Sequence, residues 1–191
     1  MRSRAVFAAM LLAAAACAGA AERLKSGTFD PPRVAPEIVQ KAADGREFRL
    51  SALRGKVVVL EFGYTTCQDV CPVSLNLLSQ ARTKLGDKLQ VVFVTVDPER
   101  DTPEKLRSYL AQFDKSFIGL TGTPQQMAAI RQAYGITATK KMVEGSKTDY
   151  TMGHSSYLYF IDPQGKLRAL MPFGRPADEI VHDVNILAQA R

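Results

Sequence analysis

The 191-residue chain has no tryptophan, two histidines and three cysteines. Small domains held together by disulfide bonds use cysteine far more densely, so that class is excluded. The apolar run from Ala5 to Ala16 is too short to cross a bilayer comfortably, and the basic residues are scattered rather than gathered in blocks. Scattered charge gives nucleic-acid binding little support, so no nucleic-acid partner is predicted.

What the N-terminus does contain is the pattern of an export signal. Two arginines precede the apolar run and small residues follow it. The small-x-small segment at 18–20 fits ordinary signal cleavage, which predicts a signal peptide over residues 1–20. The run also resembles a bacterial lipoprotein signal ending before Cys17, with Ala14 in place of the preferred leucine. Either route predicts an exported, periplasmic chain, and lipid on Cys17 would attach that chain to a membrane.

The exported part of the chain has the size of one domain. Its net charge is mild, because the formal value of +6 falls to +4 when the two leader arginines are removed. A chain of this length buries a sizeable core without disulfides, and it is expected to be a monomer. Residues 21–36 are mixed and proline-containing and predict a tether, which leaves residues 37–191 as the folded domain.

The hydrophobic pattern alternates between buried strands and amphipathic helices. Residues 56–62 (KVVVLEF) and 89–96 (LQVVFVTV) are Val-rich runs, typical of strands covered on both faces. Between them, Leu78, Ala81 and Leu85 recur at the spacing of one helix face. Further patterns predict a hairpin turn at 44–45, helices opening at 102 and 123, a short strand at FIGL, a polar excursion from about 138 to 151, a hairpin around 162–165 and a terminal helix.

This order of elements predicts an α/β protein with a central mixed sheet and helices on both faces, preceded by an N-terminal hairpin extension. It is the order of a thioredoxin-like fold with a lengthened middle. In such sheets, functional sites gather where strands end and helices begin. Cys67 and Cys71 lie at a junction of this kind, directly after the strand at 56–62.

The cysteine pair has three interpretations: a structural disulfide, a redox pair or half of a metal site. If the turn is helical, Cys67 and Cys71 share one face with β-carbons about 6 Å apart, wider than the roughly 4 Å of a relaxed disulfide. A disulfide across so short a loop would also stabilise the fold little. A helix start favours thiolates, which disulfide exchange and soft-metal binding both need. The spacing exceeds that of a Cys-x-x-Cys redox pair by one residue, which favours a metal between the sulfurs.

A third ligand for a soft ion must come from elsewhere, and the chain offers two histidines. His182 is expected on the exposed side of the terminal helix. His154 lies just before the strand SSYLYFI, in a loop that a thioredoxin-like sheet brings opposite the cysteines. Two thiolates and one neutral imidazole suit Cu(I) in a trigonal site, whereas structural Zn(II) usually needs a fourth ligand, for which Asp69, Asp97 or water are the candidates. Met152 is interpreted as a core filler.

Three stretches carry a family resemblance: FGYTTCQDVCPVSL, TVDPERDTPEKLRSYL and GHSSYLYFIDPQG. They resemble the signature blocks of the SCO/SenC family of copper-binding assembly proteins, and the likeness extends over nearly the whole exported chain. The resemblance implies a thioredoxin-like domain that binds copper, as Cu(I) or Cu(II), through Cys67, Cys71 and His154. It also implies delivery of copper to the CuA-bearing subunit of cytochrome c oxidase, or preparation of that subunit's thiols, with another periplasmic copper or thiol protein as the alternative partner.

The sequence departs from the family pattern at two places. Gln68 stands where the family often has proline after the first cysteine; this restores a backbone N–H and frees φ, so the cysteine spacing and redox potential can shift. The chain starts with a cleavable or lipidated signal rather than the transmembrane helix common in the family. The prediction is therefore a periplasmic copper chaperone rather than a conventional enzyme. The alternative is a thiol-disulfide oxidoreductase, in which Cys67 and Cys71 are catalytic and no histidine is needed.

Overall fold

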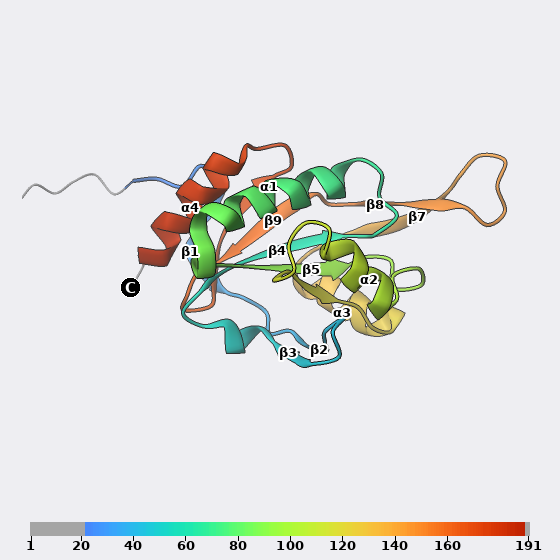
Figure 1. Cartoon of the computed structure of the whole chain (residues 1–191), viewed down its shortest axis with the longest axis horizontal. Coiled ribbons are helices and arrows are strands. Elements are labelled where there is room, and N and C mark those ends of the chain that lie inside the picture. Colours follow the sequence, from blue (N-terminus) through green and yellow to red (C-terminus); the bar gives the residue numbers. More distant parts are fainter. Residues whose placement is uncertain (1–21, 190–191) are drawn as a thin grey trace, which may run out of the picture.

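The computed structural model describes residues 22–189, and a six-stranded mixed sheet forms the centre of the molecule (Figure 1). The strands in spatial order are β1 (Gly27–Val34), β10 (Lys166–Pro172), β9 (Tyr157–Ile161), β4 (Val57–Gly63), β5 (Leu89–Thr95) and β6 (Ile118–Leu120). The three strands β4, β5 and β6 run parallel to one another. β9 is antiparallel to β4, β10 is antiparallel to β9, and β1 is antiparallel to β10.

The centre of the sheet is the pair β4 and β5, whose residues are all buried. They pair in parallel from Val57 opposite Leu89 to Gly63 opposite Thr95. Continuous Val-rich runs fit this position because both faces of each strand are covered. The two strands predicted from these runs are therefore confirmed to within a residue or two at their ends.

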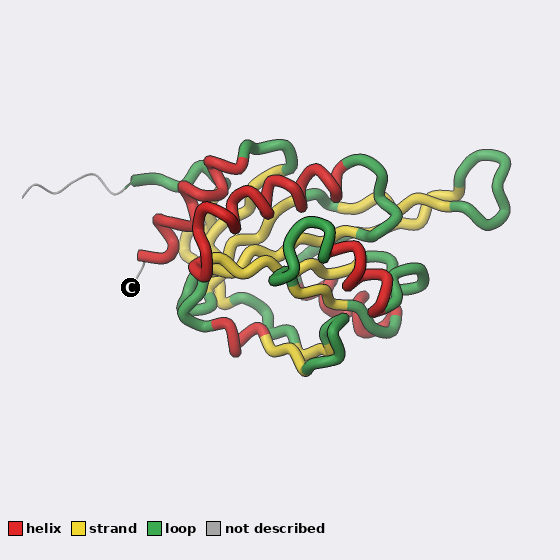
Figure 2. The backbone as a smooth tube through the Cα atoms, viewed as in Figure 1, coloured by secondary structure: helices red, strands yellow, loops and turns green. Residues whose placement is uncertain are grey.

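Helices cover both faces of the sheet, as Figure 2 shows. The face that carries Val59 and Phe93 packs against α1 (Val70–Leu85), α2 (Pro103–Leu110) and α4 (Ala177–Gln189). The other face packs against α3 (Pro124–Ala133), the 3-10 turn η1 (Leu50–Leu53) and the small hairpin of β2 (Val39–Lys41) and β3 (Glu47–Arg49). A second 3-10 turn, η2 (Gly86–Lys88), leads from α1 into β5. The predicted thioredoxin-like architecture with its N-terminal hairpin is confirmed.

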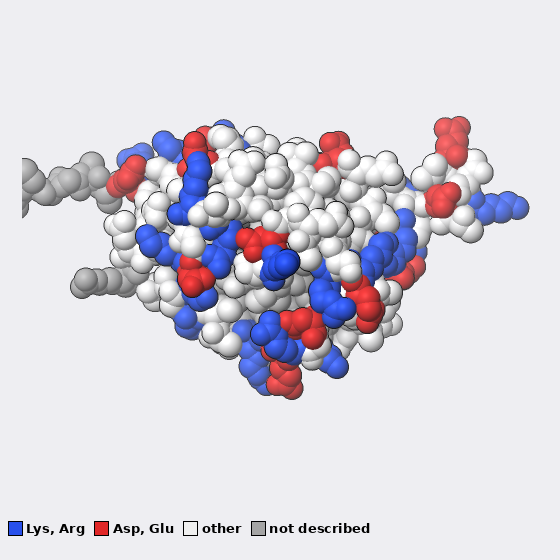
Figure 3. Space-filling model, in the orientation of Figure 1, with Lys and Arg blue, Asp and Glu red and all other residues white. Residues whose placement is uncertain are grey.

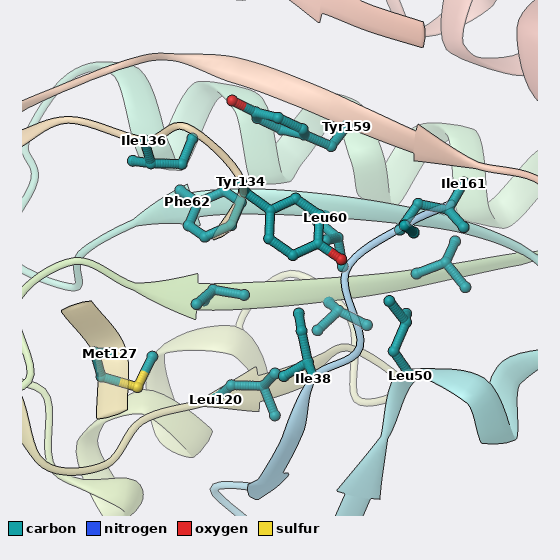
Figure 4. Packing of buried hydrophobic residues seen from close by; sticks show 14 of the residues in the cluster. Ile38, Leu50, Leu60, Phe62, Leu120, Met127, Tyr134, Ile136, Tyr159 and Ile161 are labelled. Atoms are coloured by element: carbon teal, nitrogen blue, oxygen red, sulfur yellow. The ribbon is translucent and has the colours of Figure 1, made fainter. Parts of the chain in front are cut away.

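The hydrophobic core on the face covered by α3 and the β2–β3 hairpin is built around three aromatic rings (Figure 4). Phe62 on β4 lies 5.7 Å from Tyr134 and 5.5 Å from Tyr159, centroid to centroid, and the two tyrosines lie 5.9 Å apart. Tilted and edge-on contacts of this kind add to the energy of area burial. The hydroxyl of Tyr134 donates a 2.7 Å hydrogen bond to the carbonyl of Pro36, so the ring's polar end is satisfied within the core.

Two helices begin where the sequence signals place them. Thr102 caps α2, with its side chain accepting from the backbone N–H of Lys105. Thr123 and Gln126 form a reciprocal capping box at the start of α3. The Thr102 cap and the Thr123–Gln126 capping box each satisfy backbone donors that the first helical turn leaves unpaired.

The predicted tether is wrong over half of its length, because residues 27–34 form β1 on the edge of the main sheet. Pairing with β1 satisfies the outer backbone groups of β10, which would otherwise be an open edge. Pro31 and Pro32 lack backbone donors and are tolerated only on an edge strand. Just before β1, the carboxylate of Asp183 on α4 accepts from Ser26 N and Ser26 Oγ at 3.0 and 2.5 Å.

The polar excursion is also a structured element. It forms an antiparallel hairpin of β7 (Ala138–Met142) and β8 (Tyr150–His154), here called the β7–β8 arm, which extends beyond the sheet in Figure 1. The sequence gives no apolar alternation here because most arm side chains face solvent. Lys, Arg, Asp and Glu are interspersed on the visible face in Figure 3, including the arm's end.

The predicted signal peptide, residues 1–20, lies outside the described residues. Within 22–189, no helix combines the length and the apolar character that a membrane span requires.

Candidate metal centre

The two cysteines lie in the turn that connects β4 to α1, but only one of them is helical. Asp69 is the N-cap residue and α1 begins at Val70, so Cys71 stands in the first turn and Cys67 precedes the helix. The turn is not helical at Cys67, so the two side chains do not share one helical face. Instead, the sulfur of Cys67 accepts from the backbone N–H of Cys71 at 3.4 Å, because the first turn of a helix leaves such donors free.

The turn before Cys67 is held by a buried carboxylate. Asp101, which is fully buried, accepts from Thr65 N at 3.1 Å and from Thr65 Oγ1 at 2.5 Å. Its other contact is the hydroxyl of Thr95 at the end of β5, also at 2.5 Å. Bonds to an ionised acceptor are stronger than neutral ones. This bonding fixes the turn against the carboxyl end of the sheet.

The pKa values of the two thiols are shifted in opposite directions. A hydrogen bond from the Cys71 thiol, with smaller help from backbone N–H groups of Cys71, Asp69 and Val70, lowers the pKa of Cys67 to about 5. The same hydrogen bond, together with burial and the nearby Glu61, raises the pKa of Cys71 far above its usual range. At neutral pH, Cys67 is a half-buried thiolate and Cys71 a buried thiol. Both cysteines are free of disulfide bonds.

Glu61 is a site residue that the sequence interpretation missed. It lies on β4, is 5% exposed, and burial raises the pKa of its carboxyl to about 8 despite a hydrogen bond with Ser74. Its Oε2 atom is buried and has no hydrogen-bond partner among the described residues. The available signal was a charged residue inside a continuous apolar strand, which is costly unless it has a role or a partner.

His154 lies opposite the cysteines, as predicted, but it is the last residue of β8 rather than part of a loop. With Cys71 and Glu61 it lines a small cavity of about 10 Å³. Its Nδ1 lies 3.0 Å from the carbonyl oxygen of Ser155. A carbonyl can only accept, so this contact places the proton on Nδ1 and leaves the Nε2 lone pair available to a metal.

The three predicted ligands are neighbours but do not form a closed site. Within residues 22–189, no three His, Cys, Asp or Glu side chains are close enough together to hold a metal ion. A larger groove of about 600 Å³ runs between the arm and the start of α1, and Cys67 and His154 both line it. Ion binding therefore requires the imidazole and the two sulfurs to come closer together than they are here.

The remaining candidates have other roles. Asp97 is 2% exposed and is occupied by an ion pair with Arg100 and a hydrogen bond from Tyr150. Met152 packs against the core, as interpreted, although it also lines the groove above Cys67.

The expectation that His182 is exposed is wrong. The side chain is 20% exposed and lies between Glu22 and Asp183, at 2.8 and 2.9 Å. The residues before β1 fold back on α4 and cover it, and the Asp183 contact raises the pKa of the imidazole. It takes no part in the cysteine site.

Relatives of known identity match most of this chain. A family model described as SCO1/SenC matches residues 31–189. The mitochondrial protein SCO2 of Saccharomyces cerevisiae is 36% identical over 140 residues, which cover 71% of this chain and 46% of the yeast protein. The SCO2-like protein of Rickettsia felis is 36% identical over 126 residues, or 64% of this chain and 62% of that protein. The chain thus spans about half to two thirds of these curated relatives.

Solved structures agree with the sequence match. Apo Sco1 of Thermus thermophilus is 32% identical with a TM-score of 0.78, covering 88% of this chain and 99% of that one. Copper-bound ScoI of Bradyrhizobium japonicum is 34% identical with a TM-score of 0.72, covering 81% and 99%. Because the family model extends from β1 to the end of α4, the chain belongs to the SCO1/SenC family.

Proposed function

We propose that this protein is an exported copper chaperone that carries Cu(I) as cargo on Cys67, Cys71 and His154. It delivers the ion in the periplasm for the CuA centre of cytochrome c oxidase, to the CuA-bearing subunit or to another periplasmic copper or thiol protein. Family membership supports this, as do relatives from Bradyrhizobium japonicum and Arabidopsis thaliana whose structures hold copper. Lipid on Cys17 would tie the chaperone to the membrane that contains its target.

The observation that carries the proposal is that a thiolate, Cys67, lies next to a buried, protonated thiol, Cys71, and beside the imidazole of His154. Cys67 is ionised and half-buried, with its pKa lowered to about 5 by the hydrogen bond from Cys71. Cys71 and His154 line the same small cavity, and the Nε2 lone pair of His154 is free of the Ser155 contact. Two sulfurs and one imidazole nitrogen are donors that a soft monovalent ion prefers.

Loading proceeds in an order set by these thiols. Cu(I) first meets Cys67, because thiolate is the ligating form and this one already exists at neutral pH. Cys71 becomes a ligand only by losing its proton, so loading at pH 7 releases about one proton per ion. His154 then completes a trigonal site. Delivery reverses these steps as ligands of the acceptor replace those of the chaperone one at a time.

The test is an anaerobic titration of the reduced protein with Cu(I) against a competing chelator. One ion is expected to bind tightly, with an affinity at least tenfold lower in His154→Ala, because one of three ligands is lost. His182→Ala is the matched control, since it removes the other imidazole of the chain, which pairs with Glu22 and Asp183 away from the cysteines. Equal affinity in the native protein and His154→Ala would exclude His154 as a ligand.

The second candidate function is thiol-disulfide exchange, and the contrast between the thiols favours it too. The Cys67 thiolate would attack one sulfur of a partner disulfide and displace the other as a thiolate. Cys71 would then lose its proton and attack Cys67, releasing the second partner thiol and leaving a Cys67–Cys71 disulfide. Two electrons pass to the partner.

This alternative needs both cysteines and no histidine. Reduction of a disulfide-bonded CuA-domain peptide that survives His154→Ala, but fails in Cys67→Ser, would favour the oxidoreductase. Loss of copper delivery in the same His154→Ala variant would favour the chaperone. The two assays therefore distinguish the functions with one set of proteins.

A further inference from the structure

The outer end of the β7–β8 arm's ladder, where Tyr150 pairs with Met142 beside the connecting turn, is attached to the loop after β5 by a three-residue cluster, Asp97, Arg100 and Tyr150. The guanidinium of Arg100 forms an ion pair with Asp97 through Nε and donates from Nη1 to the backbone carbonyl of Tyr150 at 2.9 Å. It also lies 3.7 Å from the centroid of the Tyr150 ring. The Tyr150 hydroxyl closes the cluster by donating to Asp97 Oδ1 at 2.9 Å.

The same guanidinium connects to His154 by a second route. Arg100 lies 5.8 Å from the ring centroid of Tyr64, within the range of cation–π attraction. Tyr64 is 7% exposed and meets His154 edge-on, with ring centroids 5.9 Å apart and planes at 84°. Arg100 therefore contacts the first residue of β8 directly and reaches the last residue, His154, through one aromatic ring.

The position of β8 matters because the ligands are not closed around a site. The cysteines are fixed by the bonded turn and the start of α1, whereas His154 is the last residue of β8 and pairs with Ala138 where the arm joins the domain. The distance from the imidazole to the sulfurs therefore depends on what holds β8. Outside the arm, β8 contacts Asp97 and Arg100 through Tyr150, the core through Met152, and Tyr64 through His154.

We propose that Arg100 is a positioning residue that sets the place of His154 for copper binding, an inference that rests on the proposed function. The guanidinium does this with three different features: one edge bonds Asp97, another bonds the strand backbone, and the flat face stacks on Tyr150. A lysine has one point charge and cannot supply all three. Arg100 is thus expected to affect copper through His154 without touching the ion.

A second ion pair in this chain provides a matched control. Arg168 donates from Nη1 to Asp162 Oδ2 at 3.0 Å in the β9–β10 hairpin, and its side chain is 28% exposed against 27% for Arg100. Both carboxylate partners are 2% exposed. Arg168→Gln therefore removes an ion pair of the same burial. Arg168 and Asp162 line neither the cavity nor the groove at the cysteines, whereas Arg100 lines the groove.

The experiment measures Cu(I) affinity by chelator competition in full-length reduced protein, with Arg100→Gln and Arg168→Gln made in the native and His154→Ala backgrounds. Loss of an outer partner of a ligating histidine typically weakens metal binding 10–100-fold, so Arg100→Gln is expected to weaken it about tenfold. Arg168→Gln is expected to change it less than twofold. In the His154→Ala background, Arg100→Gln is expected to add nothing, because its effect passes through the imidazole.

A second readout does not depend on metal. The imidazole proton resonances of His154 in metal-free protein are expected to shift in Arg100→Gln and to broaden as β8 gains freedom, and to stay in place in Arg168→Gln. Arg100→Lys is expected to restore the resonances only in part. If Arg100→Gln does not fold, Tyr150→Phe removes the Asp97 bond while keeping the ring, and a smaller shift of the same sign is expected.

The outcomes separate the two claims. An equal loss of affinity from Arg100→Gln with and without His154 would overturn the positioning role, because the effect would not pass through the imidazole. Unmoved His154 resonances in Arg100→Gln would overturn it as well. If His154→Ala alone leaves affinity unchanged, the proposed ligand set fails, while the resonances still decide whether Arg100 holds the ring.

Discussion

Glu61→Gln should make the protein more stable at neutral pH, and by an amount that grows with pH. Burial raises the pKa of the Glu61 carboxyl from 4.5 to about 8. Below pH 4.5 the group holds its proton in the folded and the unfolded chain, so it has no linkage effect there. Above that pH the unfolded chain gives up the proton while the folded chain keeps it up to about pH 8. The native protein therefore loses stability across this window.

The size of the effect follows from the width of the window. A shift of 3.5 pKa units corresponds to roughly 5 kcal/mol at its full extent, of which roughly 2.5 kcal/mol accrues between pH 5 and pH 7. Glutamine stays neutral throughout and escapes this loss. Any cost of fitting its amide beside Ser74 is the same at every pH, so the slope is the informative quantity.

The assay is urea unfolding of reduced, metal-free protein at several pH values between 5 and 8. With a slope of about 2 kcal/mol/M, the urea midpoint of Glu61→Gln is expected to gain roughly 1 M on the native midpoint between pH 5 and pH 7. Protonation of Cys67 affects both proteins and cancels in the difference. Glu144→Gln, at an exposed position in the arm, is the control and should follow the native curve. Parallel midpoints for Glu61→Gln and native protein would refute the buried-carboxyl argument.

Three further predictions follow from the same contacts. Of the two site cysteines, iodoacetamide should alkylate Cys67 alone in reduced protein, at a rate with an inflection near pH 5, and Cys71→Ala should move that inflection upward. Equal labelling of Cys67 and Cys71 in mass spectrometry would contradict the difference between their pKa values. Gly63→Ala should lower the free energy of unfolding measured in urea by about 1–3 kcal/mol, because the added β-carbon would lie 2.7 Å from the Phe93 ring and 2.9 Å from Cys71 Sγ. An unchanged free energy of unfolding would show that the Phe93 ring moves aside without cost. In the native protein the Asp183 carboxylate accepts from the backbone N–H of Lys25 at 2.7 Å, so Asp183→Ala should release the N-terminal segment and speed trypsin cleavage after Lys25. An unchanged cleavage rate would show that other contacts hold that segment.

The parts of the fold that were predictable from sequence are those whose signal is local. The runs at β4 and β5 are apolar at nearly every position because both faces are buried, and the caps at Thr102 and Thr123 use a few adjacent residues. The strand β1 depends on the open edge of β10, more than a hundred residues away, and no local pattern records that edge. The arm pairs through its backbone with polar side chains, so it lacks the alternation that identifies a half-buried strand.

The site divides in the same way. Cys67, Cys71 and His154 were identified because their residue types are rare in this chain and their chemistry is specific. Glu61 and Arg100 are common residue types. The charge of Glu61 inside an apolar run is visible in the sequence, but the roles of both residues depend on what surrounds them after folding. The pKa of Glu61 depends on burial by distant elements, and the contacts of Arg100 join a loop after β5 to the start of β8.

The measurement that tests the central claim most directly is the copper K-edge X-ray absorption spectrum of the one-to-one Cu(I) complex, recorded for the native protein and for His154→Ala. The account predicts two sulfur neighbours and one nitrogen neighbour, with the outer-shell scattering of an imidazole ring. That nitrogen and its scattering should vanish in His154→Ala. A native spectrum with sulfur neighbours alone, or one unchanged by His154→Ala, would contradict the ligand set on which the chaperone proposal rests.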